Sequence, residues 1–395
     1  MQVDNMRIEE LSDFPALQQL SNALWKVGSA RGAAILIGAG FSRNAEKSHA
    51  QTPDPPLWPQ LADELKARLY PGTDIQRDPL RLAEEFRASL GSSAIEAVIR
   101  DLIRDEEWFP GELHKALIRL PWTDILTTNW DTLLERAALE NLGQTYETVR
   151  CIGDIATTRA PRIVKLHGSL PSNRPFIISE EDYRTYPRIF APFVNLVQQT
   201  LLENELCLLG FSGDDPNFLQ WSGWVRDQLG VSARRIYLVG ALNLIPAQRR
   251  LLESRNICPI DLSPMVGSDP SISHREAATQ FLSHLAASRP TPEWDWPQKR
   301  PHSPIFNPLE KDINISVRAA RATILQWREE RDKYPGWIVC PPAIRSNLKS
   351  ATLSSLFPIS NLLDNLTPTE RGQAVFESLW RLEVALIPTF QSLLE

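Results

Sequence analysis

The sequence has few of the features that place a protein outside a reducing cytosol. Its four cysteines (Cys151, Cys207, Cys258 and Cys340) lie far apart and form no CxxC pair, which argues against a disulfide framework and a structural zinc site. The amino terminus lacks the basic start and apolar run of a secretion signal. No stretch approaches the roughly 18 uninterrupted apolar residues of a membrane span. We therefore expect a cytoplasmic protein without membrane contact.

Positive charge is not in excess either. The formal net charge is −6, so the chain as a whole does not attract phosphate backbones, and we expect no direct binding to nucleic acid. With 395 residues, the chain exceeds the roughly 150 residues of a typical domain, which favours two or more units.

Short apolar runs of the kind that form buried strands recur along the first 262 residues. They are AAILI at 33–37, DILTT ending at Thr128, IVKL at 163–166, LCLLGF ending at Phe211, RIYLVG ending at Gly240 and ICPIDL ending at Leu262. Helical patterns lie between them. Such alternation predicts an α/β fold with a doubly wound, mostly parallel, Rossmann-like sheet covered by helices on both faces.

The spacing of these runs also predicts the domain organisation. The connection from Phe41 to about Leu120 is too long for one crossover helix, so it predicts an inserted helical subdomain. We expect a catalytic domain over 1–288, a proline-rich linker over 289–312 and a helical region over 313–395. Because the last residues keep an apolar helical pattern without a cap, we expect that region to be the start of a longer protein.

The first group of candidate residues is Gly38, Ala39, Gly40, Phe41 and Ser42, directly after the first strand. Glycines at this position let the backbone approach a pyrophosphate, and the following amides and helix dipole stabilise an anion. The alternative is a tight turn without a ligand. The third glycine of a hydride-transferring enzyme is absent, as is the acidic residue about 20 positions later.

Two further groups follow the next strands. Thr128, Asn129 and Asp131 come at the end of one strand, and His167 and Gly168 at the end of another. Ligands of parallel sheets bind beyond the carboxyl ends of the strands, so these residues are expected to face the same crevice as Gly38. A histidine there can act as a general base. The alternatives are that Asn129 or Asp131 only caps a helix and that His167 is a lone surface histidine.

The fourth group is Gly210, Phe211 and Ser212, again between a strand and a helix. Its small residues would let a ribose pack against the backbone, with Ser212 within hydrogen-bonding reach. Asp215, which precedes Pro216, is interpreted as a helix cap.

Together, GAGFS, TTNWD, LHG and GFS resemble, in this order, the motifs of the sirtuin-like (silent information regulator two) family over residues 32–285. Protein deacylases of that family carry a zinc module with two CxxC pairs after the histidine, and the segment ISEEDYRTYPRIFAPF has no cysteine. The sequence therefore resembles the bacterial anti-phage branch, whose members hydrolyse NAD without a metal. This resemblance implies that NAD is the substrate and that infected cells are depleted of it in abortive infection.

The resemblance also implies roles for individual residues. Asn129 would orient water or the ribose, His167 would accept a proton, and Asp131 would help to bind the nicotinamide end. It further implies a homo-oligomer and a partner defence protein, either an ATPase or translocase or a phage-derived activator. Two alternatives stay open: a module that senses NAD or ADP-ribose and assembles partners without turnover, and an NAD-dependent protein deacylase.

Overall fold

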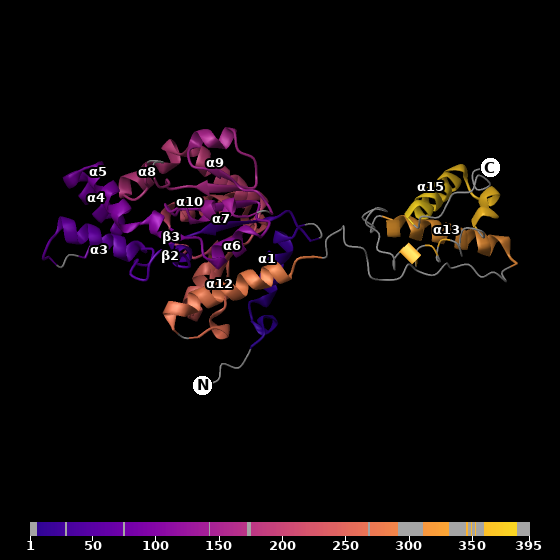
Figure 1. Cartoon of the computed structure of the whole chain (residues 1–395), viewed down its shortest axis with the longest axis horizontal. Coiled ribbons are helices and arrows are strands. Elements are labelled where there is room, and N and C mark those ends of the chain that lie inside the picture. The colour runs from indigo at the N-terminus through magenta and orange to yellow at the C-terminus, as the bar shows by residue number, and fades with distance from the viewer. Residues whose placement is uncertain are drawn as a thin grey trace. The chain divides into compact units, whose positions relative to one another are not determined.

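The computed structural model describes residues 6–27, 30–73, 76–141, 143–171, 175–267, 269–290, 311–331, 345–346, 349, 352 and 359–384. Contacts divide the chain into two compact units, Met1–Arg289 and Pro290–Glu395 (Figure 1). Most of the expected linker, Cys340 and the last residues of the chain lie outside the described residues. No helix in the described ranges is long and apolar enough to cross a membrane.

The first unit is built on one seven-stranded sheet, in which every neighbouring pair of strands is parallel. In spatial order the strands are β5 (Glu147–Val149), β6 (Arg162–Lys165), β4 (Asp124–Thr127), β1 (Ala33–Ile37), β7 (Glu205–Leu209), β8 (Ile236–Gly240) and β9 (Ile257–Asp261). The strand order reverses direction between β1 and β7, which is the point where such sheets bind ligands. The predicted fold class is therefore confirmed.

Helices cover both faces of this sheet, and alternate residues of β1 point to opposite faces. Ile35 and Ile37 pack in the core that contains α1 (Phe14–Leu24), α6 (Glu112–Ile118), α7 (Leu133–Leu139) and α12 (Pro270–Ala287). Ala34 and Leu36 pack in the core that contains α8 (Glu180–Ile189), α9 (Ala191–Glu203) and α10 (Pro216–Leu229). Burial on both faces explains why the strands are apolar throughout.

The long connection between β1 and β4 forms a subdomain, as the sequence predicts. Its elements are α2 (Ala39–Ser42), β2 (Glu46–Lys47), α3 (Trp58–Leu69), α4 (Pro79–Leu90), α5 (Ser92–Leu102) and β3 (Trp108–Phe109), followed by α6. In Figure 1, α3, α4 and α5 lie together at one end of the unit. Their shared core includes Leu65, Phe86 and Val98 and extends to Trp130 and Phe176 beside the sheet. The antiparallel ribbon of β2 and β3 was not predicted, because two residues per strand show no alternation.

Several other elements have no clear signal in the sequence. Strand β5 has only three residues at a sheet edge, α8 contains Pro187, and α11 (Pro246–Ser254) has no buried residue. Short 3₁₀ turns lie at Ile8–Glu10, Asp105–Glu107, Ile152–Ala156, Gly230–Ser232, Ser263–Met265 and Leu363–Asn365.

The second unit contains two long helices in the region that the sequence predicts to be helical. They are α13 (Ile313–Arg331) and α15 (Pro368–Val384). Val317, Ile324 and Trp327 of α13 share a core with Ala374 of α15. A buried ion pair joins Glu330 to Arg381 at 2.6 Å, and the guanidinium of Arg381 also lies over the ring of Trp327.

The inserted helices should depend on Phe86 of α4, whose side chain is 1% exposed. Phe86→Ala should lower the free energy of unfolding by about 3–5 kcal/mol, because it opens a cavity in a closed core. Leu90→Ala, at an exposed position of the same helix, is the control and should have a small effect. Urea denaturation measures both values, and equal losses in the two variants would contradict the assigned core.

Candidate active site

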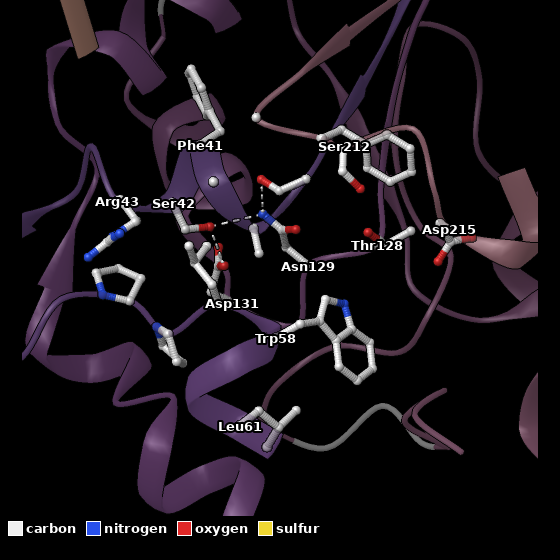
Figure 2. Close-up of a pocket in the computed structure, with 18 of the residues that line it drawn as sticks. Phe41, Ser42, Arg43, Trp58, Leu61, Thr128, Asn129, Asp131, Ser212 and Asp215 are labelled. Atoms are coloured by element: carbon white, nitrogen blue, oxygen red, sulfur yellow. Dashed lines mark hydrogen bonds between the residues drawn. The ribbon is translucent and has the colours of Figure 1, made fainter. Parts of the chain in front are cut away.

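One cavity of about 1120 Å³ lies at the carboxyl edge of the sheet, where β1, β4, β6 and β7 end. Eleven side chains or backbones predicted as site residues line it, together with the predicted base: Gly38, Ala39, Gly40, Phe41, Ser42, Thr128, Asn129, Asp131, Gly210, Phe211, Ser212 and His167. Figure 2 shows several of them around the space. Gly168, which was also predicted to contact the cofactor, does not line this cavity. The four predicted turns thus meet in one place.

The turns after β1 and β7 cross closely at glycines. A Cβ atom on Gly38 would overlap the carbonyl oxygen of Gly210, and one on Gly40 would lie 3.0 Å from that oxygen. Gly210 itself has φ +62°, a conformation that favours glycine. The amides of Gly38 and Gly40 donate to the carbonyls of Leu209 and Gly210 at 3.1 and 3.0 Å. These two amides therefore join the turns, and α2, with four residues, adds little dipole to the expected anion site.

The side-chain amide of Asn129 has a fixed orientation. Its Nδ2 donates to the carbonyl of Gly38 at 3.1 Å and to Oγ of Ser42 at 2.9 Å (Figure 2). Its buried Oδ1 has no hydrogen-bond partner among the described residues. Because the carbonyl of Gly38 can only accept, the nitrogen must face it, and Oδ1 is left as an available acceptor. Asn129 does not cap α7.

Asp131 holds Ser42 in place. Oγ of Ser42 donates to Oδ2 of Asp131 at 2.7 Å, and the amide of Leu133 donates to Oδ1 at 3.2 Å. Asp131 is 7% exposed, and each carboxylate oxygen already accepts a hydrogen bond. Asp131 precedes Thr132, the N-cap residue of α7, so its bond to the amide of Leu133 is not the side-chain cap that the sequence left open as an alternative.

His167 is 2% exposed, which rules out the interpretation as a surface histidine. Its Nε2 lies 3.3 Å from Nδ2 of Asn217, and the rings of Tyr183 and Tyr186 meet it edge-on. Burial lowers the pKa of His167 below its ordinary value, although the negative charge of Asp215 opposes this shift. The imidazole is therefore neutral at pH 7 and has one ring nitrogen that can accept a proton.

Sequence reasoning missed several residues of this region. Asn217 contacts His167 from the first turn of α10, and only the tertiary fold brings the two together. Tyr183 lines the cavity and donates to Asp215 at 2.8 Å. Asp215 also accepts from the amide of Phe218, which confirms its predicted capping role. The proline-bearing residues 54–59 also line the cavity.

The cavity lining also includes the charged side chains of Arg43 and Asp54. Arg43 and Asp54 form an ion pair at 3.6 Å, and Asp54 also pairs with Lys47 at 2.8 Å. The hydrogen bond from Lys47 is the main cause that lowers the pKa of Asp54. His274 of α12 lines the cavity too. No cluster of three His, Cys, Asp or Glu side chains in the described ranges is arranged to hold a metal ion.

A doubly wound parallel sheet with polar turns around a cavity at its switch point is the arrangement of nucleotide-binding α/β domains. Residues 123–260 match the family model of the SIR2-like domain, which confirms the sirtuin-like resemblance for that segment. The fold is also similar to a crystal structure of a SIR2 homolog–NAD complex. The alignment covers 69% of this chain and 95% of the chain in that structure, with 13% sequence identity and a TM-score of 0.38.

Several curated relatives carry the name NAD(+) hydrolase ThsA. The protein from Acinetobacter baumannii (strain 532279) is 31% identical over 189 residues, which are 47% of this chain and 37% of the relative. The protein from Bacillus cereus (strain MSX-D12) is 26% identical over 211 residues, which are 52% of this chain and 42% of the relative. The chain therefore matches less than half the length of these relatives.

Two buried histidines beside the site should make stability depend on pH. Burial lowers the pKa of His114 to about 3, and it lowers the pKa of His167 as well. Unfolded histidines titrate near 6.5, so below about pH 6.5 the unfolded state binds more protons and the free energy of unfolding falls. Each histidine contributes up to about 1.4 kcal/mol per pH unit. His114→Gln should reduce this slope in urea denaturation between pH 7 and pH 5.

The exposed His49 is the matched control, and His49→Gln should keep the slope of the unchanged protein. An unaltered slope in the His114 variant would show that its imidazole is not held neutral by the fold.

Proposed function

We propose that the chain is an NAD+ glycohydrolase, which cleaves NAD+ into nicotinamide and ADP-ribose. One observation carries this proposal: an available acceptor, Oδ1 of Asn129, and the neutral imidazole of His167 belong to the same cavity. The relatives named NAD(+) hydrolase support it. The catalytic domain would comprise residues 1–288, followed by a linker over 289–312 and a helical region over 313–395.

The cavity has the size that this substrate needs. Its volume of about 1120 Å³ is slightly above the roughly 300–1,000 Å³ that ligand pockets occupy, as suits an extended dinucleotide. Ser212 and the glycine turns offer hydroxyl and backbone groups to the sugars and phosphates. Trp58 gives the same cavity an aromatic surface (Figure 2). We therefore assign NAD+ to this cavity as the substrate.

The reaction requires positioning more than strong acid. The bond between nicotinamide and ribose breaks through an oxocarbenium-like state, and the leaving group already carries positive charge. Nicotinamide departs with the electron pair of that bond, while the oxygen of water bonds to the anomeric carbon. Oδ1 of Asn129 accepts a hydrogen bond from the water or a ribose hydroxyl, and His167 accepts the proton that is lost.

Ser42 and Asp131 position Asn129 in this scheme. The sequence suggested that Asp131 contacts the nicotinamide end directly. Because both of its oxygens already accept hydrogen bonds, we propose that Asp131 acts through Ser42 instead. The hydroxyl of Ser42 donates a hydrogen bond to Asp131 and accepts one from Asn129, so the donor and acceptor roles of the three groups are mutually compatible.

The biological setting is part of the same proposal. Depletion of NAD in infected cells would make the protein an abortive-infection effector of anti-phage defence. A homo-oligomer in the cytoplasm, controlled by a partner defence protein, is the assembly that this role would require. ATPases, translocases and phage-derived activators are the partner types we infer.

Substitution of the two proposed catalytic residues tests the activity. Asn129→Ala and His167→Ala should each reduce the rate of nicotinamide release by about 100-fold or more, because each removes a group that acts on the reacting centre. The exposed Asn22 and His49 offer matched controls, and alanine at either position should leave the rate unchanged. Chromatography of the products measures nicotinamide, and thermal unfolding shows whether each variant is folded.

Unchanged release in both variants would refute the assignment of the site. Binding of NAD+ by calorimetry without any product would instead favour a sensing module. Formation of O-acyl-ADP-ribose from an acylated peptide would favour a deacylase.

A further inference from the structure

A lysine and a glutamate are buried together directly behind the turn that carries Asn129. Lys165, the last residue of β6, is 1% exposed, and Glu135 of α7 is 5% exposed. Their Nζ and Oε1 atoms lie 3.3 Å apart. Neither residue lines the cavity, so the chemistry proposed above does not use them.

Lys165 makes a second contact that reaches the catalytic turn. Its Nζ donates to the backbone carbonyl of Asp131. Asp131 lies two residues after Asn129, and Lys165 lies two residues before His167. One ammonium group therefore connects the segments that carry the two proposed catalytic side chains.

Two other hydrogen bonds join the same segments. The indole Nε1 of Trp130 donates to the carbonyl of His167 at 2.9 Å, and the amide of Leu170 donates to the carbonyl of Trp130 at 2.8 Å. Hydrogen bonds thus join the turns after β4 and β6 both before and after His167 in the sequence. Only the contact from Lys165 depends on a buried charge, which Glu135 neutralises.

Stability alone does not explain this pair. Removing two ions from water costs several kcal/mol each, and apolar residues of similar volume often stabilise a fold equally well or better. Burial indeed raises the pKa of Glu135, which shows how unfavourable the site is for a charge. The charged ammonium of Lys165 nevertheless makes a stronger hydrogen bond to the carbonyl of Asp131 than a neutral donor would.

We propose that Lys165 and Glu135 form a positioning pair that fixes the turn of Asn129 relative to His167. This inference rests on the proposed function, because the geometry it maintains is that of the NAD-cleaving residues. Lys165 would then support turnover by positioning Asn129 and His167, without contacting the substrate itself.

The chain offers a matched control on the same two strands. Arg162 of β6 pairs with Asp124 of β4 at 2.9 Å, at the opposite end of the strands from the cavity. Arg162 is 18% exposed and Asp124 8%, so this pair is also largely buried. Arg162→Met therefore removes an interstrand charge pair without touching the catalytic turns.

Lys165→Met, Arg162→Met and the double variant Lys165→Met/Glu135→Met should be compared in the full chain. We expect Lys165→Met to lower kcat by about 10- to 100-fold, since displacements of about 1 Å cost about that much. KM for NAD+ should change less than about threefold, because the binding surfaces remain. Arg162→Met should keep kcat within about twofold. The double variant should regain thermal stability but not kcat, because the carbonyl of Asp131 stays without its donor.

Amide hydrogen exchange gives a readout that does not need catalysis. Residues 129–131 should exchange faster in Lys165→Met than in the unchanged protein, and not in Arg162→Met. If kcat of Lys165→Met equals that of the control, or recovers with stability in the double variant, the positioning role is wrong. If the unchanged protein releases no nicotinamide, the proposed function fails. In that case amide hydrogen exchange alone tests the proposed positioning pair. Unaltered exchange of residues 129–131 in Lys165→Met would then overturn the positioning role.

Discussion

The carbonyl oxygen of Gly38 can only accept a hydrogen bond, and this one constraint determines the chemistry of the cavity. It forces Nδ2 of Asn129 toward the turn after β1, and Oγ of Ser42 accepts the second hydrogen bond from the same nitrogen. The hydroxyl of Ser42 in turn donates a hydrogen bond to Asp131. The oxygen of Asn129 remains as the acceptor for a ligand. An isolated asparagine could rotate its amide, whereas this one is held by neighbours with fixed donor and acceptor roles.

The sheet makes this arrangement accessible. Strands β6, β4, β1 and β7 are direct neighbours, so the turns that follow them meet at one edge. The glycines of the turns after β1 and β7 let the two backbones approach closely enough for Gly40 to bond Gly210. That contact fixes the short helix of Ser42 next to β4. Behind the site, the buried charge of Lys165 connects the turns after β4 and β6.

Much of the fold follows from local patterns. Six of the seven strands of the sheet are apolar runs, because strands covered on both faces need no polar side. Strand β5 lies at the edge, where ETV can stay partly exposed, and α11 buries no residue, so neither carries a hydrophobic signal. The site shows the same division. Residues on the turns of the parallel strands were predictable, because sheet topology alone brings those turns together.

Contacts that depend on side-chain orientation were not predictable from sequence. Asn217 reaches His167 across 50 positions, and Lys165 reaches the carbonyl of Asp131 across 34. Gly38 and Gly40 suggested a close approach of the backbone to a pyrophosphate, yet the amides of these two glycines bond Leu209 and Gly210 of the neighbouring segment. A glycine pattern signals a close backbone approach, but it does not reveal whether the approaching group belongs to a ligand or to the protein.

A crystal structure of the His167→Ala variant with NAD+ tests the central claim most directly. Our account predicts that the dinucleotide occupies the cavity, with Oδ1 of Asn129 within hydrogen-bonding distance of a ribose hydroxyl or of a water beside the anomeric carbon. A dinucleotide bound elsewhere, or an Asn129 amide whose oxygen faces Gly38, would contradict it.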